Sequence, residues 1–287
     1  MNSLPPLHVT KLLQRYGLRP DKRLGQNFLI DPASLEKVVE AGAVGPEDAV
    51  LEIGPGLGSL TRLLAQRARQ VVAVELDHDL LAPLQEVLAG FDNVRIVEGD
   101  ILSFDPAALM GGVEQERYLV VANIPYYITS AILRHLLQAR LKPDRMTLTV
   151  QQEVAERILA GPGDMSLLAL SVQVYGRPRI AARIPAGAFY PPPNVDSAVI
   201  RLDLYPQPLI PETDLDTFFH LARAGFSQKR KTLRNSLAGG MHWPAQTAGE
   251  ILQAAGIDPR RRAETLSLEE WDRLVQVTRQ MGKEKPA

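Results

Sequence analysis

A short strand pattern, followed by three closely spaced glycines and then a helix pattern, constrains the fold of this chain most. Residues 49–53 form an apolar run that ends at Gly54, Gly56 and Gly58, and residues 59–68 carry leucines at helical spacing. Glycine allows the backbone to turn sharply and to approach a ligand closely where a parallel strand ends. The unit therefore predicts an open α/β sheet with a ligand edge at the carboxyl ends of its strands.

Strand and helix patterns continue to alternate along the chain. Strands are predicted at 70–74, 94–97, 118–122, 145–150, 180–183 and 198–204. Helices are predicted at 80–88 and 129–138, and then at 215–224, 231–238, 245–255 and 268–280. Such alternation predicts a mostly parallel sheet with helices on both faces, and the run of helices after it predicts a small all-α C-terminal domain.

Three segments follow from these patterns. Tyr205-Pro206-Gln207-Pro208 marks a boundary, so residues 31–205 are predicted to form the α/β domain and residues 206–287 the helical domain. Residues 1–30 form a leading segment.

The glycine loop does not match the dinucleotide-binding pattern. Its spacing is G-x-G-x-G rather than G-x-G-x-x-G, and Pro55 removes one backbone donor, which argues against a pyrophosphate ligand. On its own the loop fits a ligand site and a tight turn without a ligand equally well.

Acidic residues at the ends of the next two strands favour the ligand. Glu75 follows Gly54 by 21 residues, where a carboxylate accepts hydrogen bonds from two ribose hydroxyls, and Asp77 competes for this role. Asp100 follows the strand at 94–97 and can accept from the exocyclic amine of an adenine. Each alone fits a solvated loop acid. Together with the glycines they outline a ligand with a ribose and an adenine, which S-adenosylmethionine fits better than a nicotinamide dinucleotide does.

The tetrapeptide Asn123-Ile124-Pro125-Tyr126 follows the strand at 118–122. The side-chain oxygen of Asn123 and the carbonyl of Ile124, pinned by Pro125, could each accept one hydrogen of a base amine. This would orient the nitrogen toward the methyl donor and stabilise the positive charge that develops on it. Tyr126 would stack on the unstacked base. Taken alone, the tetrapeptide also fits a turn with a core tyrosine.

Further motifs extend the pattern over nearly the whole chain. They are Lys22–Leu29, Ala188–Ala198, Phe226–Leu237 and Arg262–Ser267. With the glycine loop, the two acids and the tetrapeptide, the chain resembles the ribosomal RNA adenine N6-dimethyltransferases, and among them the small-subunit enzymes. At Gln228-Lys229 the chain departs from the resemblance, which implies a more arginine-rich stretch, but the local positive charge is kept.

The resemblance implies a Rossmann-like class I methyltransferase that uses S-adenosylmethionine. Residues 1–30 would close over a cofactor site made of Asn27, Leu29, Gly54, Gly56, Glu75, Asp100 and Asn123. The catalytic residues would be Asn123, Ile124, Pro125, Tyr126 and Phe189, with the target adenine between the two aromatic rings. Phe189 also fits a loop anchor packed on the core. RNA would be bound by Arg23, Lys229, Arg230, Lys231 and Arg234, although these also fit a solvated surface.

The implied reaction is N6,N6-dimethylation of two adjacent adenosines near the 3′ end of 16S rRNA, in an immature small ribosomal subunit whose maturation it would serve. Three alternatives remain open. One is the 23S rRNA adenine methyltransferase of macrolide resistance, which shares the catalytic motifs. Another is a DNA adenine methyltransferase, which is less favoured because the chain has no obvious segment for reading a DNA sequence. The third is a binding or assembly factor that retains the fold.

Composition limits the remaining possibilities. The chain has no cysteine, and its five histidines are scattered without ligand spacing, so no metal is expected. Its start lacks the pattern of a secretory signal and no apolar run is long enough to span a bilayer, so a cytoplasmic location is expected.

The charge is unevenly distributed along the chain. Residues 1–30 carry net charge +4, residues 31–116 carry −11 and residues 117–262 carry +7, which leaves basic surface available for RNA. Nothing demands more than a monomer.

Overall fold

The computed structural model describes residues 4–111 and 117–283, and the chain divides into two compact units. Residues 1–155 and 177–204 group in the first unit, and residues 156–176 and 205–287 group in the second. The first three residues of the predicted leading segment and the last four of the predicted helical domain lie outside the described residues. The boundaries expected from the sequence, at residues 30 and 205, stay predictions.

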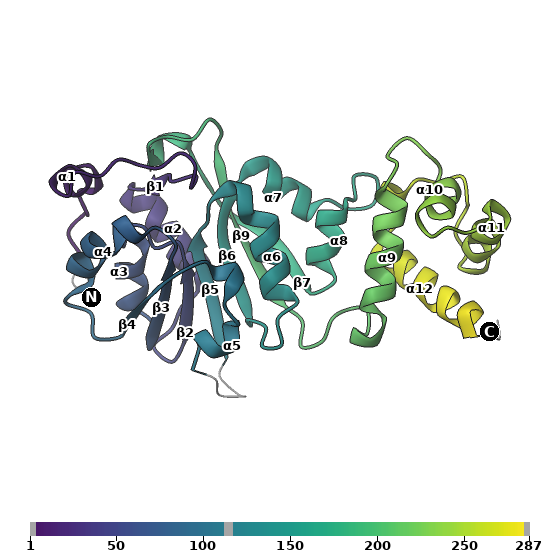
Figure 1. Cartoon of the computed structure of the whole chain (residues 1–287), viewed down its shortest axis with the longest axis horizontal. Helices are drawn as coiled ribbons and strands as arrows, with labels where there is room; N and C mark the ends of the chain where they lie inside the picture. Colours follow the sequence, from purple (N-terminus) through teal and green to yellow (C-terminus); the bar gives the residue numbers. More distant parts are fainter. Residues whose placement is uncertain (1–3, 112–116, 284–287) are drawn as a thin grey trace. The chain divides into compact units, whose positions relative to one another are not determined.

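The first unit is built on a seven-stranded sheet with the strand order β4-β3-β2-β5-β6-β9-β7 and with helices on both faces (Figure 1). Five strands pair in parallel: β2 (Ala49–Ile53), β3 (Gln70–Glu75), β4 (Val94–Glu98), β5 (Tyr118–Asn123) and β6 (Arg145–Gln151). The strand β9 (Ser197–Leu204) runs antiparallel to β6, and β7 (Gly176–Ile184) lies at the edge. The predicted α/β class, with a mostly parallel Rossmann-like sheet, is confirmed.

The helices of this unit are short. They are α1 (Val9–Arg15), α2 (Pro32–Gly42), α3 (Ser59–Ala65), α4 (Leu81–Leu88), α5 (Pro106–Leu109) and α6 (Thr129–Leu137), and α7 (Gln152–Leu159) crosses the division between the units. The start of α2 shows why a helix forms there. Pro32 occupies its first turn, and the Asp31 side chain accepts a hydrogen bond from the Ser34 amide at 2.8 Å. Val38 of α2 and Leu64 of α3 are fully buried in one core cluster with the sheet residue Val121.

The leading segment reaches the glycine loop. Val9, Leu12 and Leu13 of α1 form a small apolar cluster with Leu57 of the loop and with Phe28. The two-residue strand β1 (Phe28–Leu29) then pairs antiparallel with β8 (Phe189–Tyr190). Hydrophobic contacts and a short ladder therefore hold this segment near the ends of the parallel strands.

The second unit is helical and consists mainly of α8 (Leu167–Gln173), α9 (Leu215–Phe226), α10 (Leu233–Gly240), α11 (Ala245–Ala254) and α12 (Leu268–Lys283). Trp271 of α12 is fully buried, and a Cβ added to Gly225 of α9 would lie 2.7 Å from its ring, so glycine permits this close packing. Within the described ranges, no helix is both long and apolar enough to cross a membrane.

Candidate active site

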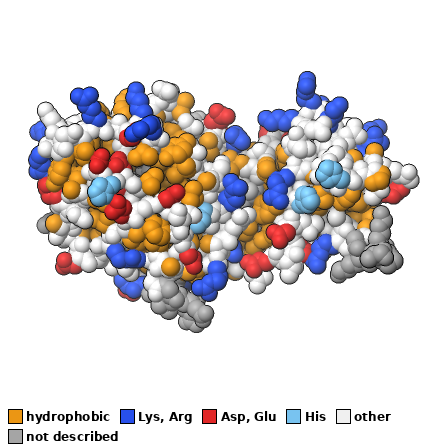
Figure 2. Space-filling view, in the orientation of Figure 1, with side chains coloured by type: hydrophobic (Ala, Val, Ile, Leu, Met, Phe, Trp, Pro, Cys, Tyr) orange, Lys and Arg blue, Asp and Glu red, His pale blue; other side chains and the backbone are white. Residues whose placement is uncertain are grey.

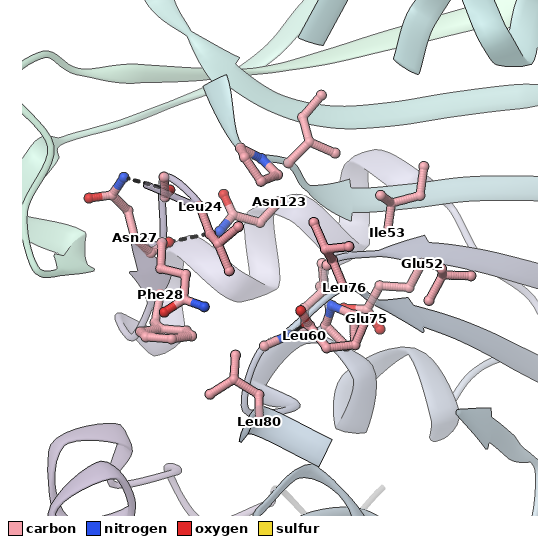
Figure 3. Close-up of a pocket in the computed structure, with 18 of the residues that line it drawn as sticks. Leu24, Asn27, Phe28, Glu52, Ile53, Leu60, Glu75, Leu76, Leu80 and Asn123 are labelled. Carbon is pink, nitrogen blue, oxygen red and sulfur yellow. Dashed lines mark hydrogen bonds between the residues drawn. The ribbon is translucent and has the colours of Figure 1, made fainter. Parts of the chain in front are cut away.

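A pocket opens where the parallel strands β2, β3 and β5 end, and the leading segment contributes part of its wall (Figure 3). All seven residues predicted to bind the cofactor line it: Asn27, Leu29, Gly54, Gly56, Glu75, Asp100 and Asn123. Ile124, Pro125 and Tyr126 line it as well. The structure therefore brings residues from five separate parts of the chain to one cavity, as expected for the carboxyl edge of an open α/β sheet.

The glycine loop is shaped by close approach. Gly56 has a φ of 58°, and a Cβ at this position would lie 2.9 Å from the Phe28 ring. Its backbone N–H donates to a carboxylate oxygen of Glu75 at 2.9 Å. The loop is thus fixed between the leading segment and the end of β3, and only glycine fits the space between them.

Glu75 is 6% exposed and accepts two backbone hydrogen bonds at 2.9 Å, from Gly56 and from Asp77. Burial raises the pKa of this carboxyl above its usual range, against the opposite effect of those hydrogen bonds. Each carboxylate oxygen still has capacity to accept a further donor such as a ribose hydroxyl. The competing acid, Asp77, accepts from the Gln26 side chain at 2.6 Å and does not line the pocket.

Glu52, directly before the glycine loop, is a pocket residue to which the sequence assigned no role. It is 1% exposed, and its Oε2 has no hydrogen-bond partner among the described residues. Burial raises the pKa of its carboxyl to about 8 against the opposite effect of the nearby Thr61 hydroxyl, and the Glu75 carboxylate adds to the rise. Its place in the strand directly before the glycines was the available signal. A buried oxygen without a partner beside the pocket fits a bound ligand that carries a hydrogen-bond donor.

The side chain of Asn123 has a defined orientation. Its Nδ2 donates to the backbone carbonyl oxygen of Asn27 at 3.1 Å (Figure 3). The Asn27 side chain in turn donates to the carbonyl of Gly25 at 3.1 Å, which braces the leading segment. With Nδ2 engaged, Oδ1 of Asn123 is the atom of the amide left to accept a hydrogen bond from a substrate.

The two predicted stacking residues are in different surroundings. Tyr126 is half-buried at the pocket, and its hydroxyl lies 2.6 Å from the Ser197 hydroxyl. Phe189 is 3% exposed, belongs to the core cluster that includes Val38, and is not among the residues that line the pocket. It pairs with Leu29 in the β1–β8 ladder. The structure thus brings Tyr126 to the pocket and leaves Phe189 in the core.

The predicted RNA-binding residues are exposed. The Arg23 side chain is 90% exposed and pairs with Asp21 at 2.9 Å. In the second unit, Lys229, Arg230 and Lys231 precede α10, and Arg234 lies on its first turn. On the face drawn in Figure 2, lysine and arginine side chains are interspersed with acidic and apolar ones. No group of three or more metal-ligating side chains is present among residues 4–111 and 117–283.

Comparison with protein families gives one match over most of the chain. The family model for ribosomal RNA adenine dimethylase matches residues 18–280. A protein of Dehalococcoides mccartyi named ribosomal RNA small subunit methyltransferase A is 49% identical over 92% of this chain and 90% of its own length. A protein of the same name from Moorella thermoacetica is 46% identical over 93% of this chain and 95% of its own length.

Two solved structures share the fold. The 23S rRNA methyltransferase ErmE has a TM-score of 0.69 and 30% identity, with coverage of 88% of this chain and 99% of that one. A dimethyladenosine transferase from Plasmodium falciparum has a TM-score of 0.74 and 24% identity, with coverage of 89% and 98%. Both likenesses cover most of this chain.

Proposed function

The chain belongs to the ribosomal RNA adenine dimethylase family, and from this premise we propose which reaction it catalyses. It transfers methyl groups from S-adenosylmethionine to N6 of two adjacent adenosines near the 3′ end of 16S rRNA, two methyls to each. The observation that carries this proposal is the pocket at the strand ends. Asn123, with Oδ1 available as an acceptor, lines it together with Glu75 and Asp100, the residues predicted to bind the adenosine part of the cofactor.

The residues of the pocket suit the cofactor. S-adenosylmethionine supplies an activated methyl group on a sulfonium sulfur. Glu75 would accept from the ribose hydroxyls, Asp100 from the adenine amine, and the glycine loop would let the backbone approach closely. Asp100 uses one carboxylate oxygen to accept from the Leu102 amide at 2.9 Å, so its other oxygen is available. The buried carboxyl of Glu52, which also lines the pocket, would provide a further polar contact.

Catalysis rests on orientation of the target amine. The lone pair of an adenine N6 is delocalised into the ring, so the nitrogen is a poor nucleophile. When Oδ1 of Asn123 and the carbonyl of Ile124 each accept one amine hydrogen, the nitrogen moves toward a tetrahedral geometry and its lone pair faces the methyl group. The same two oxygens stabilise the positive charge that develops on nitrogen. The methylated ammonium then loses its proton readily, so no strong general base is needed.

The second transfer to the same nitrogen has a different requirement. After one methylation the amine retains a single hydrogen, so it satisfies only one of the two acceptor oxygens. Stacking on Tyr126 then contributes more of the orientation, at roughly 1–3 kcal/mol per stacked base. Phe189 stays the predicted second stacking residue.

The substrate is an immature small subunit, recognised through Arg23, Lys229, Arg230, Lys231 and Arg234. The proposal places the enzyme in the cytoplasm as a monomer. The 23S alternative is less favoured, because the two small-subunit relatives are 46% and 49% identical to this chain, against 30% for the 23S enzyme.

A methyl-transfer assay tests the proposal. Labelled S-adenosylmethionine is supplied with unmethylated small subunits or, separately, with unmethylated large-subunit RNA, and the products are digested to nucleosides. We expect N6,N6-dimethyladenosine on small subunits alone. Label on large-subunit RNA would favour the resistance methylase, and cofactor binding without transfer to either would favour the binding-factor alternative.

A further inference from the structure

We propose that Ser197 is a positioning residue for methyl transfer: its hydroxyl holds the ring of Tyr126 where that ring stacks on the target adenine. The inference rests on the proposed function, because it assigns Tyr126 the stacking role.

The contact itself is short and shielded. The two hydroxyl oxygens lie 2.6 Å apart, and Ser197 is 0% exposed. A hydroxyl buried to this extent has no water to replace its partner, so losing either oxygen leaves the other unsatisfied. The bond therefore stabilises one position of the phenol rather than competing with solvation.

Ser197 is itself held by the sheet. It is the first residue of β9 and lies opposite Gln151 in the antiparallel ladder between β9 and β6. One residue beyond this pair, the N–H of Gln152 donates to the carbonyl of Asp196 at 3.0 Å, so the backbone pairing continues past Ser197. The Ser197 hydroxyl is thus supplied by a regular part of the sheet rather than by a free loop.

Tyr126 gains from such a contact because its own segment is only partly buried. It begins the short 3-10 turn Tyr126–Ile128, none of whose residues is buried. The backbone end of Tyr126 is held by the Thr129 hydroxyl, which donates to its carbonyl at 3.1 Å. Ser197 holds the opposite end of the side chain, so the two contacts together fix the position and the long axis of the ring.

A ring without its distal contact would sample more positions around its side-chain torsions. Base binding would continue, because an aromatic face remains, but fewer bound bases would have the amine aligned with Asn123. The second methylation should suffer most, since only one amine hydrogen is then left to orient the nitrogen. The expected signature is a slower chemical step with an increased share of monomethyladenosine.

The matched variants Ser197→Val and Ser197→Thr test this, because valine and threonine have nearly the same shape and differ by one hydroxyl. In single-turnover assays on unmethylated small subunits, we expect S197V to transfer methyl groups about 10-fold more slowly than the wild type. S197T, which keeps a hydroxyl, should stay within about twofold of the wild-type rate. Dissociation constants for S-adenosylmethionine and for the subunit should be unchanged in both. The ratio of monomethyl to dimethyl product should rise in S197V only.

Tyr126→Phe provides a second test that leaves the packing at Ser197 intact. It should reproduce the S197V rate and product ratio, and the double variant should be no slower than either single variant. Equal rates for S197V and S197T, or additive losses in the double variant, would overturn the inference. If the wild-type chain itself forms no dimethyladenosine on small subunits, the proposed function fails instead.

Discussion

The side-chain amide of Asn123 donates to the backbone carbonyl oxygen of Asn27 at 3.1 Å. This bond joins the end of β5 to the leading segment, 96 residues earlier in the chain. It also selects one of the two orientations of the amide, with Nδ2 toward the segment and Oδ1 available as an acceptor. The same side chain therefore helps to close the pocket and offers the oxygen on which the proposed chemistry depends.

Replacing Asn123 by aspartate tests the closing role. A carboxylate would place an acceptor against the Asn27 carbonyl oxygen, so the hydrogen bond would become a repulsion. We expect the leading segment to loosen and the amides of residues 24–29 to exchange at least about 10-fold faster with deuterated solvent. Amides of α6, elsewhere in the same unit, serve as the internal control. Unchanged exchange at 24–29 would show that the bond does not hold the segment.

Glu75 and Asp77 can be separated by their cofactor affinities. Glu75→Ala removes the acceptor of two backbone bonds and of the proposed ribose contact, and hydrogen bonds to charged groups are worth about 1.5–3 kcal/mol each. We expect calorimetric affinity for S-adenosylmethionine to fall by at least about 10-fold. Asp77→Ala, the same truncation at the competing acid, should have a smaller effect because Asp77 does not line the pocket. The opposite ranking would move the ribose role to Asp77.

Glu52 should make stability depend on pH. Its carboxyl has a pKa of about 8 in the folded chain and about 4.5 when unfolded, so between these values the folded state holds a proton that the unfolded state has released. Stability therefore falls as pH rises through this window, by at most about 1.4 kcal/mol per pH unit for one group. Glu52→Gln should flatten that fall in urea unfolding from about pH 5 to about pH 8. Glu75, whose pKa is also raised by burial, contributes a residual slope of the same sign. Parallel curves for the two proteins would contradict this assignment.

The basic stretch before α10 should contribute salt-sensitive affinity. Replacing Lys229, Arg230 and Lys231 by alanine removes three exposed charges, and each phosphate contact accounts for a slope of about 0.7–0.9 in a plot of log affinity against log salt. We expect weaker binding to small subunits and a shallower slope, with cofactor affinity unchanged. Arg260→Ala is the control, since Arg260 is already paired with Asp258 at 3.2 Å. An unchanged slope in the triple variant would assign these residues to a solvated surface.

Regular patterns account for the parts of the fold that were predicted. The strands at 49–53, 70–75 and 118–123 are mostly apolar and nearly all buried, as expected of the inner strands of a parallel sheet. Since each is followed by glycine, acid or amide residues, the edge of the sheet where a ligand binds was predictable too. The helix α2 was missed, although Asp31-Pro32 is a standard start signal. The two-residue strands β1 and β8 carry no periodicity and exist only through pairing with each other.

The parts of the site that were missed depend on contacts between distant residues. Nothing local to Ser197 indicates that its hydroxyl meets Tyr126, 71 residues earlier. For Phe189 the sequence left two interpretations open, a stacking residue and a core anchor, because the pairing of Leu29 with Phe189 in the β1–β8 ladder has no local signal. Glu52 received no role of its own from the sequence, because nothing local shows that a carboxylate in this strand is fully enclosed beside the pocket.

The most direct test of the central claim is single-turnover methyl transfer by Asn123→Ala on unmethylated small subunits, with subunit binding measured on the same preparation. If Oδ1 of Asn123 orients and stabilises the target amine, the rate should fall by about 100-fold or more, while subunit affinity stays within about twofold of the wild type. Methyl transfer at close to the wild-type rate would contradict the account, because the amine would then be oriented by another group. A loss of subunit binding that matches the loss of rate would contradict it as well, since Asn123 would then act in recognition rather than in the chemical step.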